Sequence, residues 1–181
     1  MPINKAILKE QLQFFPKSEL VEMLLKLSKK GHNYDFLLIN YLDTEGGEQQ
    51  LFDETIEKLI AVSDKEFKGR TVQHQRVKML SASIKCINEF MVEAKNKKLE
   101  ADLICWVLVR EFEQPASMFG AKFSGYDFKI GLLTKRLIGL VQNKLHPDYF
   151  IDYQDQLNEF LTKLHKTSNR INTIKALPYS V

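Results

Sequence analysis

Four histidines, two cysteines and several rows of carboxylates are the residues of this chain whose types could support metal binding or catalysis. No two histidines are three or four residues apart, which is the spacing that puts two ligands on one face of a helix. Neither cysteine has a second cysteine within four residues. We therefore expect no metal ion and no cofactor. The residues in question are His32, His74, His146, His165, Cys86 and Cys105.

The carboxylates Asp152, Asp155 and Glu159 follow one another at steps of three and four, so they lie on one face if their segment is helical. Such a row could bind a hard cation or act as acid and base in an enzyme. It can equally be a solvated acidic face near a helix N-terminus. A Glu-x-x-His pair, a nucleophile motif and a phosphate-binding glycine loop are all missing from the sequence, so we expect no enzymatic activity.

A cluster of basic residues precedes and enters the middle of the chain. This edge could follow the phosphates of a ligand or a nucleic acid, although it lacks interleaved aromatic residues that would stack on bases. Alternatively, these cations pair with the six acidic residues between positions 43 and 57, or with an acidic protein partner. The candidate basic patch consists of Lys68, Arg70, His74, Arg76, Lys78 and Lys85.

The segment 115–126 begins at Pro115 and contains two glycines, so it is the longest irregular stretch that we expect. It is also rich in large apolar side chains. These can pack back on the body of the protein or meet a partner. The candidate interaction loop consists of Met118, Phe119, Phe123 and Tyr126.

The elements that position these groups follow from helical periodicity. Between positions 77 and 94, apolar residues recur at alternating steps of three and four, which predicts a long helix over 72–96. A second helix over 99–113 is apolar almost all round, and we expect these two helices to be central. The run 103–109 also suits a strand, but its flanks favour a helix and no partner strand is evident.

Similar patterns predict the remaining helices. Over 3–14, Ile7, Leu8 and Leu12 should face inward, and Pro16 should end the helix. The next helix starts near Ser18 and should bury Leu20, Leu24 and Leu27. A polar loop is expected over 43–48, and a loosely attached tail over 167–181. Further helices are expected over 34–42, 49–62, 127–145 and 149–166.

These elements make an all-α fold of seven to nine helices in antiparallel pairs. Either an irregular helical bundle or a short HEAT-like α-solenoid would satisfy the pattern. At 181 residues, with 44% hydrophobic and 27% charged residues, the chain 1–181 is most simply a single helical domain.

Composition also limits location and partners. The longest strictly apolar run, 103–109, is too short for a membrane span, and no secretory signal is visible at the N-terminus. Two thiols inside apolar runs are typical of a reducing compartment. We therefore expect a cytoplasmic protein without a membrane partner. The net charge of +3 is mild for a dedicated nucleic-acid binder.

The opening of the chain reads LKEQLQFFPKSELVEMLLKLSKK over 8–30 and NYDFLLINYL over 33–42. It resembles a family of small bacterial all-helical proteins of unknown function, in which a Ser/Lys-Glu-Leu step leads into a leucine-rich second helix. The resemblance implies a helical, HEAT-like fold and transfers no catalytic residue. From these patterns together we expect a module that binds another protein. The alternative is a protein that binds phosphate or nucleic acid over Lys68–Lys85. A third hypothesis is an enzyme with a carboxylate site.

Overall fold

The computed structural model describes residues 5–28, 32–42, 44–121 and 125–181, and over these residues the fold is all-α. It divides into two compact units, residues 1–49 and residues 50–181. The boundary lies inside helix α4 (Thr44–Asp64). The expectation of a single helical domain over 1–181 stays a prediction, and each unit is described separately below.

The first unit contains α1 (Lys5–Gln13), α2 (Lys17–Ser28), α3 (His32–Leu37) and a π-helical turn over Leu38–Leu42. Helix α1 ends before Pro16, as predicted from the conformational restriction that proline places on its neighbour. The residues expected to form one helix over 34–42 instead change from α to π geometry at Leu38.

Helix α4 starts within the segment that the sequence assigned to a polar loop. It begins at Thr44 and includes both Gly46 and Gly47. A Cβ atom on Gly47 would lie 3.1 Å from Cγ1 of the buried Ile39. Glycine here therefore allows the start of α4 to approach the π-helical turn closely, and the helix continues despite the low helix propensity of the pair.

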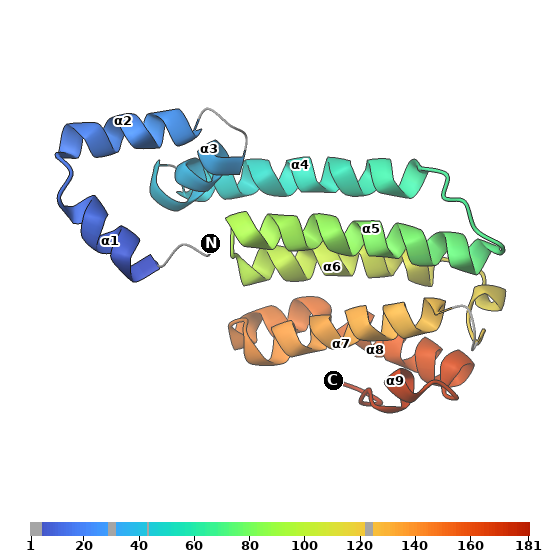
Figure 1. The fold of residues 1–181 in the computed structure, drawn as a ribbon. Coiled ribbons are helices and arrows are strands. Elements are labelled where there is room, and N and C mark those ends of the chain that lie inside the picture. The colour runs from blue at the N-terminus through green and yellow to red at the C-terminus, as the bar shows by residue number, and fades with distance from the viewer. Residues whose placement is uncertain (1–4, 29–31, 43, 122–124) are drawn as a thin grey trace. The chain divides into compact units, whose positions relative to one another are not determined.

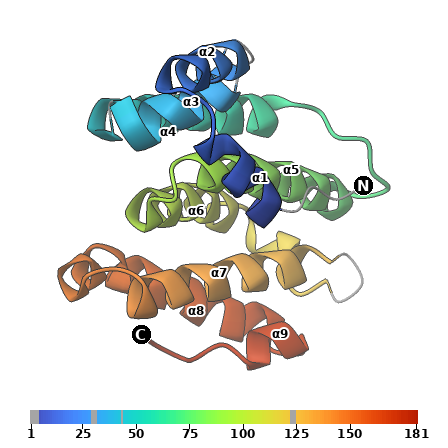
Figure 2. The ribbon, with the colours of Figure 1, turned by 60° about the vertical axis from the view of Figure 1, so that its left-hand side comes forward.

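The second unit contains the rest of α4, then α5 (Val72–Glu93), α6 (Lys97–Phe112), α7 (Tyr126–Asn143), α8 (Phe150–Ser168) and the short α9 (Asn172–Lys175). Short 3₁₀ turns at Ala116–Met118 and Pro147–Tyr149 precede α7 and α8. Figures 1 and 2 both show α5 beside α6 and α7 beside α8, each pair joined by a short connection. This unit is an antiparallel helical bundle.

Side-chain caps fix where α5 and α6 begin. The Thr71 hydroxyl accepts a hydrogen bond from the His74 amide at 3.3 Å, and the Asn96 side chain accepts from the amides of Lys98 and Leu99. The sequence placed Asn96 at the end of the preceding helix and Lys97 in the connection that follows it. They belong to the start of α6, since an asparagine cap satisfies amides that have no partner within the helix.

Helix α7 is the centre of the second unit. It packs against α5, α6, α8 and α9 and buries apolar side chains over most of its length. We expected the two helices over 72–96 and 99–113 to be central. Helix α6 is indeed buried on most sides, which confirms a helix and not a strand over 103–109, but α5 keeps an exposed outer face.

The C-terminal segment packs on the bundle. Ile174 and Leu177 are buried, the Tyr179 ring stacks on His165 with centroids 4.3 Å apart, and the Val181 amide donates to Asn158 Oδ1 at 2.8 Å. The expectation of a loosely attached tail over 167–181 is therefore wrong. Two apolar side chains spaced by three residues suffice to dock the short α9 and the turn after it.

Candidate functional site

Many large apolar side chains of the first unit are exposed on α1, on α2 and in the turn between them. Helix α2 buries none of its described residues, and the side chains of Leu25 and Leu27 are each 59% exposed. We name the following set the α1–α2 apolar surface: Ile7, Leu8, Leu12, Phe14, Phe15, Val21, Leu24, Leu25 and Leu27.

Helical geometry explains the width of this surface. At 100° per residue, the apolar residues of α2 from Leu20 to Leu27 cover more than half of the circumference of the helix. Leu20 and Met23 are half-buried, and α2 packs against α3. One neighbouring helix covers only part of so wide an arc, so Val21, Leu24 and Leu25 remain exposed.

The sequence assigned Leu24 and Leu27 to a buried face, which the structure contradicts. Periodicity alone could not reveal the difference, because the same spacing describes a core-facing stripe and a partner-facing stripe. One feature of the sequence could have indicated an exposed apolar face. Helix α2 carries more large apolar residues than contact with a single neighbouring helix requires.

Charged side chains border the apolar residues of α2. Glu22 and Lys26 lie one turn apart with Oε2 and Nζ at 4.0 Å, and both are exposed. Glu19 lies in the first turn and Lys26 in the last, where each charge suits the helix dipole. An apolar patch with a charged border is typical of a protein–protein contact surface.

The candidate interaction loop, in contrast, belongs largely to the core. Met118, Phe119 and Tyr126 are buried, and Phe123 lies outside the described residues. The Phe119 ring stacks on Phe112, and Phe112 in turn stacks on Phe160 of α8 with centroids 4.3 Å apart. The sequence left open whether this loop packs on the body of the protein or meets a partner. Its three described side chains pack on the body, so they offer no surface to a partner.

Tyr126 forms part of a buried polar chain across three helices. Its hydroxyl donates to Glu111 Oε2 at 2.8 Å, and Arg76 of α5 donates to both carboxylate oxygens, at 2.6 and 3.3 Å. Burial raises the pKa of Glu111, although the Arg76 cation and the Tyr126 hydroxyl oppose that shift. Burial and the neighbouring carboxylate also raise the pKa of Tyr126, so it remains a neutral donor.

The other members of the candidate basic patch have separate surroundings. Lys78 Nζ donates to the Lys68 carbonyl at 2.6 Å, His74 Nδ1 lies 2.8 Å from the Thr71 hydroxyl, and Lys85 lies 3.7 Å from Glu89 on its own helix. Arg70 is exposed. The patch is therefore not one continuous cationic edge, and Arg76, its most deeply placed cation, is paired with Glu111 of α6 and not with the acidic block.

A polar cleft of about 540 Å³ opens where α4 ends and α5 begins. We call it the junction cleft. Its walls come from the end of α4, the connection to α5, the first turns of α5 and the residue Gln114 beyond α6. It is lined by Ser63, Asp64, Lys65, Glu66, Phe67, Val72, Gln75, Arg76, Met79 and Gln114.

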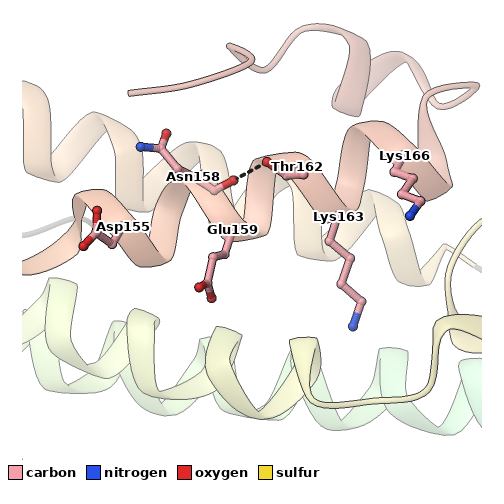
Figure 3. Close-up of a pocket in the computed structure, with 6 residues that line it drawn as sticks. All are labelled: Asp155, Asn158, Glu159, Thr162, Lys163 and Lys166. Atoms are coloured by element: carbon pink, nitrogen blue, oxygen red, sulfur yellow. Dashed lines mark hydrogen bonds between the residues drawn. The ribbon is translucent and has the colours of Figure 1, made fainter.

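A second hollow, of about 650 Å³, lies along α8 and is lined by six residues of that helix alone (Figure 3). Asp155 and Glu159 of the predicted carboxylate row line it, together with Lys163. The Lys163 ammonium is engaged, because it donates to the carbonyls of Phe112 and Gln114 at the end of α6. Asp152 is exposed. Among the described residues, only α8 supplies walls to this hollow, which has the character of a solvated helix face.

Within the described residues, no group of three or more His, Cys, Asp or Glu side chains is arranged to hold a metal ion. Both cysteines are free and partly buried. Burial raises the pKa of Cys86 and raises that of Cys105 to about 11. Since the thiolate is the reactive form, both are poor nucleophiles near neutral pH.

Among the same residues, no helix combines the length and the apolar character that a membrane crossing needs. No family model matches this chain, and neither a curated protein nor a solved structure matches it. The resemblance noted for residues 8–42, with the HEAT-like fold it implies, stays a prediction.

Proposed function

We propose that this chain is a non-catalytic, cytoplasmic helical module whose α1–α2 apolar surface binds another protein. The observation that supports it best is that α2 buries none of its described residues although half of them are large and apolar. Large apolar side chains that gather on one exposed element are typical of a surface that a partner covers.

The chemistry of the surface indicates the chemistry of the partner. Leucine, valine and phenylalanine side chains offer no hydrogen-bonding groups, so the partner should present an apolar helix or groove of similar width. The exposed Glu22 and Lys26 carry opposite charges, so they do not select a strongly acidic or basic partner. Affinity would come from burial of apolar area, at roughly 25 cal/mol per Å² before the costs of association.

Phosphate or nucleic-acid binding over Lys68–Lys85 has less support. Phosphate contacts need cations that are free to approach the ligand. Arg76 is held in an ion pair with the buried Glu111, and Lys78 donates to a main-chain carbonyl. Lys68, Arg70 and Lys85 are exposed, but Lys85 lies beside Glu89 on its own helix, so the remaining electrostatic footprint is small.

Charge placed on the apolar surface tests the proposal. The double variant Val21→Glu with Leu25→Glu adds two carboxylates at exposed positions on one stripe of α2. The fold should persist because neither position is buried. A partner that covers the stripe would have to bury both charges, which is costly. We expect recovery of co-purifying proteins from the source cells, measured by quantitative mass spectrometry, to fall at least about tenfold.

The matched control is Val92→Glu, which charges a 71% exposed apolar position on α5. It should retain the partners, and melting temperatures of all three chains should agree within a few degrees. Equal recovery of the same proteins by the wild type and the double variant would refute the proposed surface.

A further inference from the structure

We propose that the junction cleft is a binding site for a small zwitterionic ligand, a free α-amino acid with an apolar side chain. Its carboxylate would bind Arg76, its ammonium group would bind Asp64 and Glu66, and its side chain would cover Phe67, Val72 and Met79. The inference concerns the second unit alone and does not depend on the α1–α2 apolar surface.

The Arg76 guanidinium is held in position before any ligand arrives. Glu111 receives hydrogen bonds from Nε and Nη2, and the Tyr126 hydroxyl fixes the same carboxylate from α7. In the part of the chain that the structure describes, these bonds leave Nη1 available, and Arg76 lines the cleft. A guanidinium with a fixed orientation loses little entropy when it binds a carboxylate.

The connection between α4 and α5 is also held in place. Gln75 Nε2 donates to the Gly69 carbonyl at 3.4 Å, and Lys78 Nζ donates to the Lys68 carbonyl at 2.6 Å. A Cβ on Gly69 would lie 2.9 Å from the Gln75 amide nitrogen, so only glycine allows this close approach. These contacts give the cleft a defined wall between Lys65 and Val72.

The charges of the lining favour a zwitterion over an anion. Lys65 and Arg76 supply positive charge, while Asp64 and Glu66 supply negative charge, and Glu111 already offsets Arg76 from behind. A phosphate would meet two lining carboxylates and be repelled by them. A ligand with one ammonium and one carboxylate group can pair with both signs.

The volume of the junction cleft and its apolar lining also suit a free amino acid with an apolar side chain. A volume of about 540 Å³ lies within the ordinary range for small-molecule sites. The amide groups of Gln75 and Gln114 can add hydrogen bonds, and Phe67, Val72 and Met79 provide apolar contact area for one side chain.

Titration calorimetry of the full chain with L-leucine, L-methionine and L-phenylalanine tests the proposal. At least one should bind with a dissociation constant of about 1 mM or below. Leucinamide, which lacks the carboxylate, and N-acetyl-leucine, which lacks the ammonium group, should each bind at least about tenfold more weakly than leucine.

The variant Val72→Trp fills the cleft from an exposed position at the start of α5 and leaves the Arg76–Glu111 pair untouched. It should weaken binding at least about tenfold, whereas Val92→Trp on the same helix should not. The proposal is overturned if none of the three amino acids binds with a dissociation constant of about 1 mM or below, if both analogues bind as well as leucine, or if Val72→Trp binds like the wild type.

Discussion

The carboxylate of Glu111 joins three helices of the second unit through polar contacts. It lies on α6, pairs with Arg76 of α5 and accepts the Tyr126 hydroxyl from α7. Two further carboxylates act similarly: Glu100 pairs with Arg136 of α7, and Asp102 accepts the Tyr153 hydroxyl from α8. Polar contacts of this kind fix which helix faces which neighbour, since each group must find its own partner.

Titration of Glu111 should make the free energy of unfolding depend on pH. Its pKa in the folded protein is raised above the ordinary 4.5 because burial disfavours the charged form. Its contribution to the free energy of unfolding is therefore fully present below the unfolded-state pKa and is lost as pH rises through the folded-state pKa. Glu111→Gln removes this titration and keeps an acceptor for Tyr126.

Urea unfolding of both chains between about pH 4 and pH 8 measures the effect. The difference in unfolding free energy, wild type minus E111Q, should decrease as pH rises and then level off. An increase with pH would mean that attraction to Arg76 outweighs burial.

Sequence reasoning identified Arg76 but not its function in the fold. Spacing along one helix places Arg70, His74 and Lys78 on one edge, whereas Arg76 joined the candidate basic patch only because it is close to them in the sequence. The partner that decides its chemistry, Glu111, is 35 residues away on another helix. Nothing in the local pattern around either residue predicts that contact.

At the scale of elements, α7 depends on the absence of a side chain at Gly131. A Cβ there would lie 2.6 Å from Ile174 Cδ1 and 3.3 Å from Thr173 Cγ2, and both of these residues belong to α9. Gly139, two turns later on the same helix, has nothing within 4 Å of its hypothetical Cβ. The two glycines therefore provide a matched pair for measuring how firmly α9 packs on α7.

Gly139→Ala should stabilise the protein by about 0.5–1 kcal/mol, because alanine restricts the unfolded chain and favours the helix. Gly131→Ala should instead destabilise it by about 1–3 kcal/mol through overpacking against Ile174. Adding Ile174→Val removes the clashing Cδ1 atom and should recover part of that loss. Urea unfolding of these chains and of the single variant Ile174→Val measures this coupling. Equal stabilisation by both alanines would show that α9 does not pack here.

The helices themselves were largely predictable. Periodicity and proline located α1, α2 and α5 to α8 to within a few residues, because apolar side chains at helical spacing form one stripe along a helix, whether that stripe is buried or exposed. The errors arise where a local signal was ambiguous. Gly46-Gly47 is typical of a loop, yet Ile39 requires glycine in a helix, and Asn96 caps α6 although it also suits the end of α5.

At the scale of the whole molecule, the two units differ in how they use apolar residues. The second unit buries them between α5, α6, α7 and α8, whereas the first displays them on α1 and α2. Sequence alone could not predict this division, because Leu24 and Leu137 occupy equivalent positions in equivalent stripes. Only the packing shows that Leu137 is buried and Leu24 is exposed.

A photo-crosslinking amino acid placed at Leu25, compared with the same group at Val92, tests the central claim most directly. Both positions are exposed and apolar, so the probe should be tolerated at each. After irradiation in the source cells, mass spectrometry identifies what each probe has reached. We predict that the probe at position 25 forms abundant crosslinks to a second protein chain and the probe at position 92 forms few. Crosslinks from position 25 confined to residues 50–181 of the same chain would contradict the account.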